Sequence, residues 1–167
     1  MNCRFTMILL LAACFSAPVL QDWQTIDANG LFSFRLPAGF TKDAGDDVRA
    51  EYHKRGTKLI YVWGQTESPS YNDRRQASMH DYEESITRIG GKRANIRAYR
   101  QTIDGKRIYR AELNVGNWEK GEVQLYMRVE SSDPAMLETA REIFKSVSFP
   151  LPSPERPDSS HREFRPR

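Results

Sequence analysis

Residues 92–115, KRANIRAYRQTIDGKRIYRAELNV, form two alternating runs on either side of Asp104-Gly105. An Asp-Gly pair in this position predicts a type I′ hairpin, because both central residues of that turn need a positive φ. A two-residue turn there places Arg97 opposite Glu112. It also collects apolar and small side chains on one face, whereas a one-residue slip would mix them with polar ones. The pattern therefore predicts both the hairpin and its register.

Residues 122–129 alternate in the same sense and predict a third antiparallel strand. If Val115 faces Val123 across the connecting loop, Arg110 lies opposite Arg128, which is unfavourable unless an acid or a bound anion lies between them. Arginines among tyrosines can bind anionic groups and can also take part in stacking. The candidate binding surface on the outer face of the meander consists of Arg97, Tyr99, Arg110, Tyr126 and Arg128. A solvated face with a cross-strand Arg97–Glu112 pair is the alternative.

Composition points to one soluble domain of ordinary size. The chain has 167 residues and a net charge of +3, and the two signs of charge are interspersed. A nucleic-acid-binding domain usually shows a clustered basic surface, so we expect no nucleic acid partner. The two cysteines, Cys3 and Cys14, both lie near the N-terminus, so the sequence predicts a domain without disulfide or thiol chemistry.

The N-terminus predicts export. A single charge at Arg4 precedes an apolar run at residues 5–13, which has the length of a signal-peptide h-region and is too short to span a bilayer. An exported protein would be periplasmic, secreted or held at a membrane of the cell envelope. A buried first strand in a cytoplasmic protein is the alternative.

The end of this run, LAAC at residues 11–14, resembles the lipobox of bacterial lipoproteins. The resemblance implies a diacylglyceryl thioether on Cys14, removal of residues 1–13 as a signal peptide, and a short tether at residues 14–22. The lipid on Cys14 would then attach the protein to a membrane, with several acyl chains giving stable attachment. An ordinary secretory signal, cut near residues 16 and 17, is the other possibility.

Two further hairpins precede the meander. Residues 23–36 flank Asn29-Gly30, and residues 48–65 flank a turn with Gly56. Within the second hairpin, residues 59–63 are almost continuously apolar and predict a central strand covered on both faces. The polar residues 41–47 between the hairpins predict a loop.

Two helices are predicted from apolar residues at helical spacing. The first covers residues 72–89 and ends at Gly90-Gly91. Its stripe consists of Met79, Tyr82, Ile86 and Ile89. The second follows a cap at residues 132–134, where a proline takes the first helical position. Its stripe consists of Met136, Leu137, Ala140, Ile143 and Phe144.

The order of these elements predicts an α+β fold, with an antiparallel sheet and helices on one or both faces. The domain would span residues 23–149. Residues 150–167 hold five of the nine prolines and several arginines, which predicts a disordered tail.

Motifs for catalysis or cofactors do not stand out. The histidines His53, His80 and His161 lack metal-ligand spacing, and no Gly-rich phosphate loop or nucleophile motif is present in the sequence. We therefore predict no catalytic residue, no metal and no cofactor.

Two patterns stand near the ends of residues 23–149: Phe32-x-Phe34-x-Leu36-Pro37-x-Gly39-Phe40 and the closing Ile143-x-x-Ser146-x-x-Phe149. With these patterns the chain resembles the PsbP-like superfamily, which includes an extrinsic photosystem II protein, a Ran-binding import factor and many exported bacterial proteins. The resemblance implies an α/β/α sandwich that acts as an interaction module. No motif for Ran, manganese or photosystem contacts is matched.

The sequence thus favours an exported, lipid-anchored, non-catalytic binding or scaffolding module of the bacterial cell envelope. Its partner would be an envelope protein or an anionic ligand. An exported enzyme with a dispersed site, such as a hydrolase of envelope polymers, is the alternative. That enzyme would need a deep pocket with two titratable groups at working distance.

Overall fold

The computed structural model describes residues 22–64, 79–120 and 122–151. The predicted signal peptide, Cys14 and nearly all of the predicted tail lie outside these residues. None of the described helices is long and apolar enough to cross a membrane.

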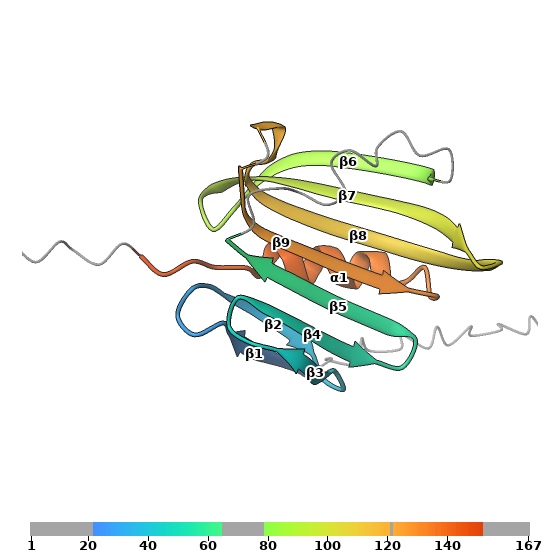
Figure 1. Ribbon diagram of the computed structural model, residues 1–167, viewed down its shortest axis with the longest axis horizontal. Helices are drawn as coiled ribbons and strands as arrows, with labels where there is room; N and C mark the ends of the chain where they lie inside the picture. Colours follow the sequence, from blue (N-terminus) through green and yellow to red (C-terminus); the bar gives the residue numbers. More distant parts are fainter. Residues whose placement is uncertain (1–21, 65–78, 121, 152–167) are drawn as a thin grey trace, which may run out of the picture.

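The fold is α+β, and the described residues form a seven-stranded antiparallel sheet, a separate two-stranded sheet and one α-helix. The two-stranded sheet consists of β1 (Trp23–Asp27) and β2 (Ser33–Pro37). The large sheet consists of β3 (Thr41–Gly45), β4 (Arg49–Lys54), β5 (Thr57–Trp63), β6 (His80–Ile89), β7 (Lys92–Ile103), β8 (Lys106–Asn117) and β9 (Glu122–Ser131). A 3-10 helix, η2 (Trp118–Lys120), joins β8 to β9, and α1 spans Met136–Lys145. The strand order in the large sheet is β3-β4-β5-β9-β8-β7-β6 (Figure 1).

One face of the large sheet carries the hydrophobic core, which α1 and β2 cover together. From α1, Ala140, Ile143 and Phe144 are fully buried against the sheet. From the first hairpin, the Phe32 ring stacks on Trp63 at 5.4 Å between centroids. The described residues therefore form two layers, and the α/β/α sandwich implied by the resemblance reduces here to helix cover on one face.

The predicted hairpin of the meander is confirmed. Arg97 pairs with Glu112, and Asp104 and Gly105 have φ of 51° and 75°, as a type I′ turn requires. The hairpins β1–β2 and β4–β5 are confirmed too. The helix α1 is confirmed, but it begins at Met136 after Ala135 rather than with the proline at residue 134 in its first position. Strand β5 lies between β4 and β9, so its prediction as a central strand is confirmed.

The predicted register of the third strand is wrong by two residues. Val115 pairs with Leu125, and Gly116 pairs with Val123 across a register shift. Gly116 adopts φ of 124°, a conformation open to glycine because it lacks a Cβ. The bulge brings Glu130, rather than Arg128, opposite Arg110.

The predicted helix at residues 72–89 is wrong where the structure describes it, since residues 80–89 form strand β6. Gly90 and Gly91 have φ of 53° and 80° and make a two-residue turn that pairs β6 with β7. Backbone pairing with β7 thus outweighs the helical spacing of four apolar residues. The prediction of a loop at residues 41–47 is also wrong in part, because β3 pairs along β4 as an edge strand.

Candidate functional site

The face of the large sheet opposite α1 is mostly polar, and we call it the polar face. Strand alternation places Arg97, Tyr99, Arg110, Tyr126 and Arg128 on this one face of β7, β8 and β9. The structure therefore brings the five predicted binding residues together on adjacent strands.

Three of the five residues are not exposed, contrary to the expectation of a solvated outer face. Arg97, Tyr99 and Tyr126 are 2%, 3% and 3% exposed. They surround Glu112, which is itself 1% exposed. Alternation in a sequence assigns a residue to a face but does not show whether that face is covered.

Glu112 is the centre of this buried group, which we call the Glu112 cluster (Arg97, Tyr99, Glu112, Tyr126). Its Oε1 accepts hydrogen bonds from the Tyr99 hydroxyl at 2.9 Å and the Tyr126 hydroxyl at 3.0 Å. Its Oε2 lies 3.1 Å from the Arg97 guanidinium, so the predicted cross-strand pair is confirmed, but in a buried setting. Burial and the Glu112 charge raise the pKa of Tyr99, which keeps the phenol protonated as a donor.

Arg110 and Arg128 are partly exposed and share one carboxylate. Arg110 Nε lies 2.8 Å and Arg128 Nε 3.1 Å from Oε1 of Glu130. Arg110 also donates to the side chain of Gln101. Glu130 therefore relieves the repulsion expected between Arg110 and Arg128. The position of Glu130 opposite Arg110 was not predicted, because the bulge at Gly116 could not be recognised from the sequence.

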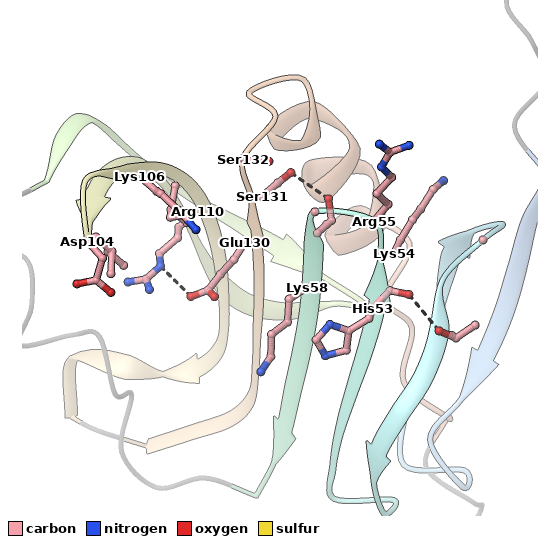
Figure 2. Close-up of a pocket in the computed structure, with 16 residues that line it drawn as sticks. His53, Lys54, Arg55, Lys58, Asp104, Lys106, Arg110, Glu130, Ser131 and Ser132 are labelled. Carbon is pink, nitrogen blue, oxygen red and sulfur yellow. Dashed lines mark hydrogen bonds and ion pairs between the residues drawn. The ribbon is translucent and has the colours of Figure 1, made fainter.

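A groove of about 830 Å³ lies where the β4–β5 turn, the β7–β8 turn and the end of β9 meet (Figure 2). We call it the basic groove. Its cationic lining residues are Lys54, Arg55, Lys58, Lys106 and Arg110. Its acidic ones are Asp104 and Glu130. Cations outnumber acids by five to two, so the groove is positively charged.

The cations of the basic groove fall into two groups: three are held by contacts with other residues, and two are not. Lys58 and Arg110 are held by carboxylates, since Lys58 Nζ lies 2.6 Å from Glu51 and lowers the pKa of that carboxyl. Lys54 Nζ donates to the Ala38 carbonyl at 2.9 Å. Arg55 and Lys106 are exposed in the two turns, and their side chains make no ion pair or hydrogen bond with another described residue.

Sequence reasoning found only Arg110 among the residues of the basic groove. The signal that it passed over is a pair of basic residues at each of two turns, Lys54-Arg55 and Lys106-Arg107. The two turns lie at the same end of the sheet's strands because β9 pairs with both β5 and β8. That pairing is not visible from local sequence.

His53, one of the three histidines without metal-ligand spacing in the sequence, lies at the wall of the groove. Its Nε2 is 3.6 Å from Asp43 and 3.8 Å from Glu51. Within the described ranges, no three His, Cys, Asp or Glu side chains are placed to hold a metal ion.

No family model matches this chain, and no curated protein matches it. Among solved structures, it is similar to the Ran-binding protein Mog1p of Saccharomyces cerevisiae, with a TM-score of 0.52 and 8% identity over 76% of this chain and 95% of that one. The prediction named a superfamily that includes a Ran-binding import factor, so this likeness supports the fold part of the resemblance. At this identity the likeness shows the fold alone.

Two bacterial structures are less similar. LpqN, involved in cell envelope biogenesis of Mycobacterium tuberculosis, has a TM-score of 0.38 and 15% identity over 78% of this chain and 80% of that one. A Pseudomonas aeruginosa protein of unknown function, described as a putative regulator, has a TM-score of 0.41 and 12% identity over 79% and 98%. Neither value is high enough to support an argument about this chain.

Proposed function

We propose that this protein is an exported, lipid-anchored binding module of the bacterial cell envelope that holds an anionic ligand in the basic groove without catalysing a reaction. The observation that carries the proposal is the gathering of five cationic side chains around one concave site, from two hairpins far apart in the sequence. A concave site lined by one sign of charge concentrates ligands of the opposite sign.

The arrangement of the cations favours binding over a purely structural role. Glu130 and Glu51 fix the guanidinium of Arg110 and the ammonium of Lys58 in place, which lowers the entropy lost when a ligand is bound. Arg55 and Lys106 are exposed in two turns at the same end of the sheet, so each side chain is free to move toward a bound anion. With Lys54 on the Ala38 carbonyl, the groove thus has three held cations and two that remain adjustable.

The acids of the basic groove favour binding rather than hydrolysis. Glu130 is contacted by two guanidinium groups, those of Arg110 and Arg128. Asp104 lies in the exposed β7–β8 turn. A hydrolase of envelope polymers needs two titratable groups working on one bond, and these two carboxylates face different surroundings.

Reversing the two adjustable cations should abolish most of the binding. In Arg55→Glu/Lys106→Glu, we expect affinity for inorganic polyphosphate, measured by titration calorimetry at low salt, to fall about tenfold or more, or roughly 1.4 kcal/mol. The melting temperature should hardly change, because both side chains are exposed. Lys120→Glu/Lys145→Glu is the matched control, since it makes the same change in net charge at exposed residues outside the groove. Equal losses in the two variants would show that only net charge matters and would refute the site.

Lipid attachment is tested separately by metabolic labelling with a fatty-acid analogue. We expect label on the wild-type chain and none on Cys14→Ala, because only the thiol can form the thioether. Processing in the variant is followed by its mobility on a gel. A cleaved wild-type product without label would contradict lipid anchoring and would indicate an ordinary secretory signal.

A further inference from the structure

Strand β6 is an edge of the large sheet. One side of it pairs with β7, and within the described part of the chain no strand pairs with the other side. Nine of its ten residues are exposed. An edge strand of this length offers backbone N–H and C=O groups on which another strand can pair.

The part of β6 that can pair regularly is short and well defined. At one end, a register shift lies between His80 and Glu83, and Asp81 has φ of 55°. At the other end, the chain turns at Gly90. Regular pairing therefore covers Glu83–Ile89, whose midpoint is Ile86. The Ile86 side chain is 62% exposed, an unusual position for a large apolar residue at the middle of an edge.

We infer that β6 pairs antiparallel with β6 of a second copy of this chain, about a two-fold axis at Ile86. In that register Ile86 meets Ile86 of the other copy. Glu84 lies opposite Arg88 of the other copy, and the same pair recurs on the far side of the axis. Ser85 lies opposite Thr87. The apolar residue thus meets an apolar residue, each charge meets an opposite charge, and each hydroxyl residue meets a hydroxyl residue, as a self-complementary interface requires.

Neighbouring registers do not give this match. An axis at Ser85 would place Glu84 opposite Ile86, and an axis at Thr87 would place Ile86 opposite Arg88. Axes at residues 84 and 88 would each place a charge opposite its own copy. Like charges directly opposite are destabilising, so the sequence of β6 favours the axis at Ile86.

The side chains that form the cross-copy pairs are already oriented by their own chain. Glu84 accepts hydrogen bonds from Asn95 and, at 3.1 Å, from the Tyr82 hydroxyl. Arg88 donates to the Gly91 carbonyl at 3.0 Å. An ionised carboxylate has about four acceptor sites, so these two hydrogen bonds are compatible with a further one from the Arg88 guanidinium of the other copy.

Sedimentation equilibrium of the full-length chain in neutrally buoyant detergent tests the inference. We expect the wild type to dimerise and Ile86→Lys, which places two ammonium groups at the axis, to raise the dissociation constant about tenfold or more. Val48→Lys is the matched control, because Val48 is 46% exposed but lies outside β6, and it should dimerise like the wild type. A wild type that stays monomeric at about 100 μM, in the range expected of weak specific pairs, would overturn the inference. So would equal effects of the two lysine variants.

A charge swap shows whether the register is right. Arg88→Glu and Glu84→Arg should each dimerise poorly alone, because each places like charges opposite each other twice. Mixed together they should form a heterodimer, since every Glu then meets an Arg. This rescue also shows that both variants fold, and its failure with two folded variants would overturn the register.

Discussion

Glu112→Ala should lower the free energy of unfolding by about 3–5 kcal/mol, the cost typical of breaking a buried ion pair from one side. The substitution removes the Glu112 carboxylate that lies 3.1 Å from the guanidinium of Arg97, which is 2% exposed. It also removes the shared acceptor of the Tyr99 and Tyr126 hydroxyls. Urea unfolding followed by far-UV circular dichroism measures the change.

Two further variants separate charge from hydrogen bonding in the Glu112 cluster. Glu112→Gln keeps an oxygen for the tyrosines and should lose less than Glu112→Ala. Arg97→Met/Glu112→Leu removes both charges and should recover a large part of the loss, because no charge is then left buried alone. If Glu112→Ala instead shifts stability by less than about 0.5 kcal/mol, as surface substitutions do, Glu112 is not the centre of a buried network.

The meander hairpin could be predicted because its information is local. Asp104-Gly105 specifies the turn, and alternation on both sides specifies which face each residue takes. The same logic held for the hairpin around Asn29-Gly30. In both cases the turn and the strands it joins are adjacent in sequence.

Strand β6 could not be recognised in this way. As an edge strand it is exposed on both faces, so its side chains do not alternate between apolar and polar. The helical spacing of four apolar residues therefore led to the prediction of a helix, which is wrong here. Gly90-Gly91 was equally consistent with a hairpin turn, and only pairing with β7 settles which structure forms.

For the candidate binding residues, the sequence predicted a shared face but not their burial. Alternation correctly grouped Arg97, Tyr99 and Tyr126 on one face, but their burial around Glu112 depends on tertiary packing. The basic groove depends on strand order, because β9 inserts between β5 and β8 and sets their two turns on either side of its end. Neither fact follows from a local pattern.

The inferred dimer and the proposed groove would support each other. A two-fold axis perpendicular to the sheet joins two seven-stranded sheets into one and leaves both polar faces on the same side. The same rotation reverses the strand direction, so the two basic grooves, each at the end of a β9, would lie at opposite ends of the joined sheet. A ligand that presents repeated anionic groups could occupy both and gain affinity without any new contact.

Gly116→Ala should lower the free energy of unfolding by about 3 kcal/mol or more, since backbone strain and overpacking each contribute roughly 1–3 kcal/mol. A Cβ on Gly116 would lie 2.6 Å from the Glu122 carbonyl oxygen and 3.1 Å from the Gln124 nitrogen. Both are backbone atoms of β9, so relief requires the strand to move.

Gly105→Ala is the matched control for this effect. Gly105 also has a positive φ, 75°, but a Cβ there would meet nothing within 4 Å. It should therefore cost only the conformational strain, about 1–2 kcal/mol. The difference between the two variants, measured by urea unfolding, isolates the close approach of β8 to β9 at the bulge. Equal losses of stability would mean that the backbone of β9 can move at Glu122 at little cost in free energy. The bulge would then be a consequence of the pairing of Arg110 with Glu130 rather than its cause.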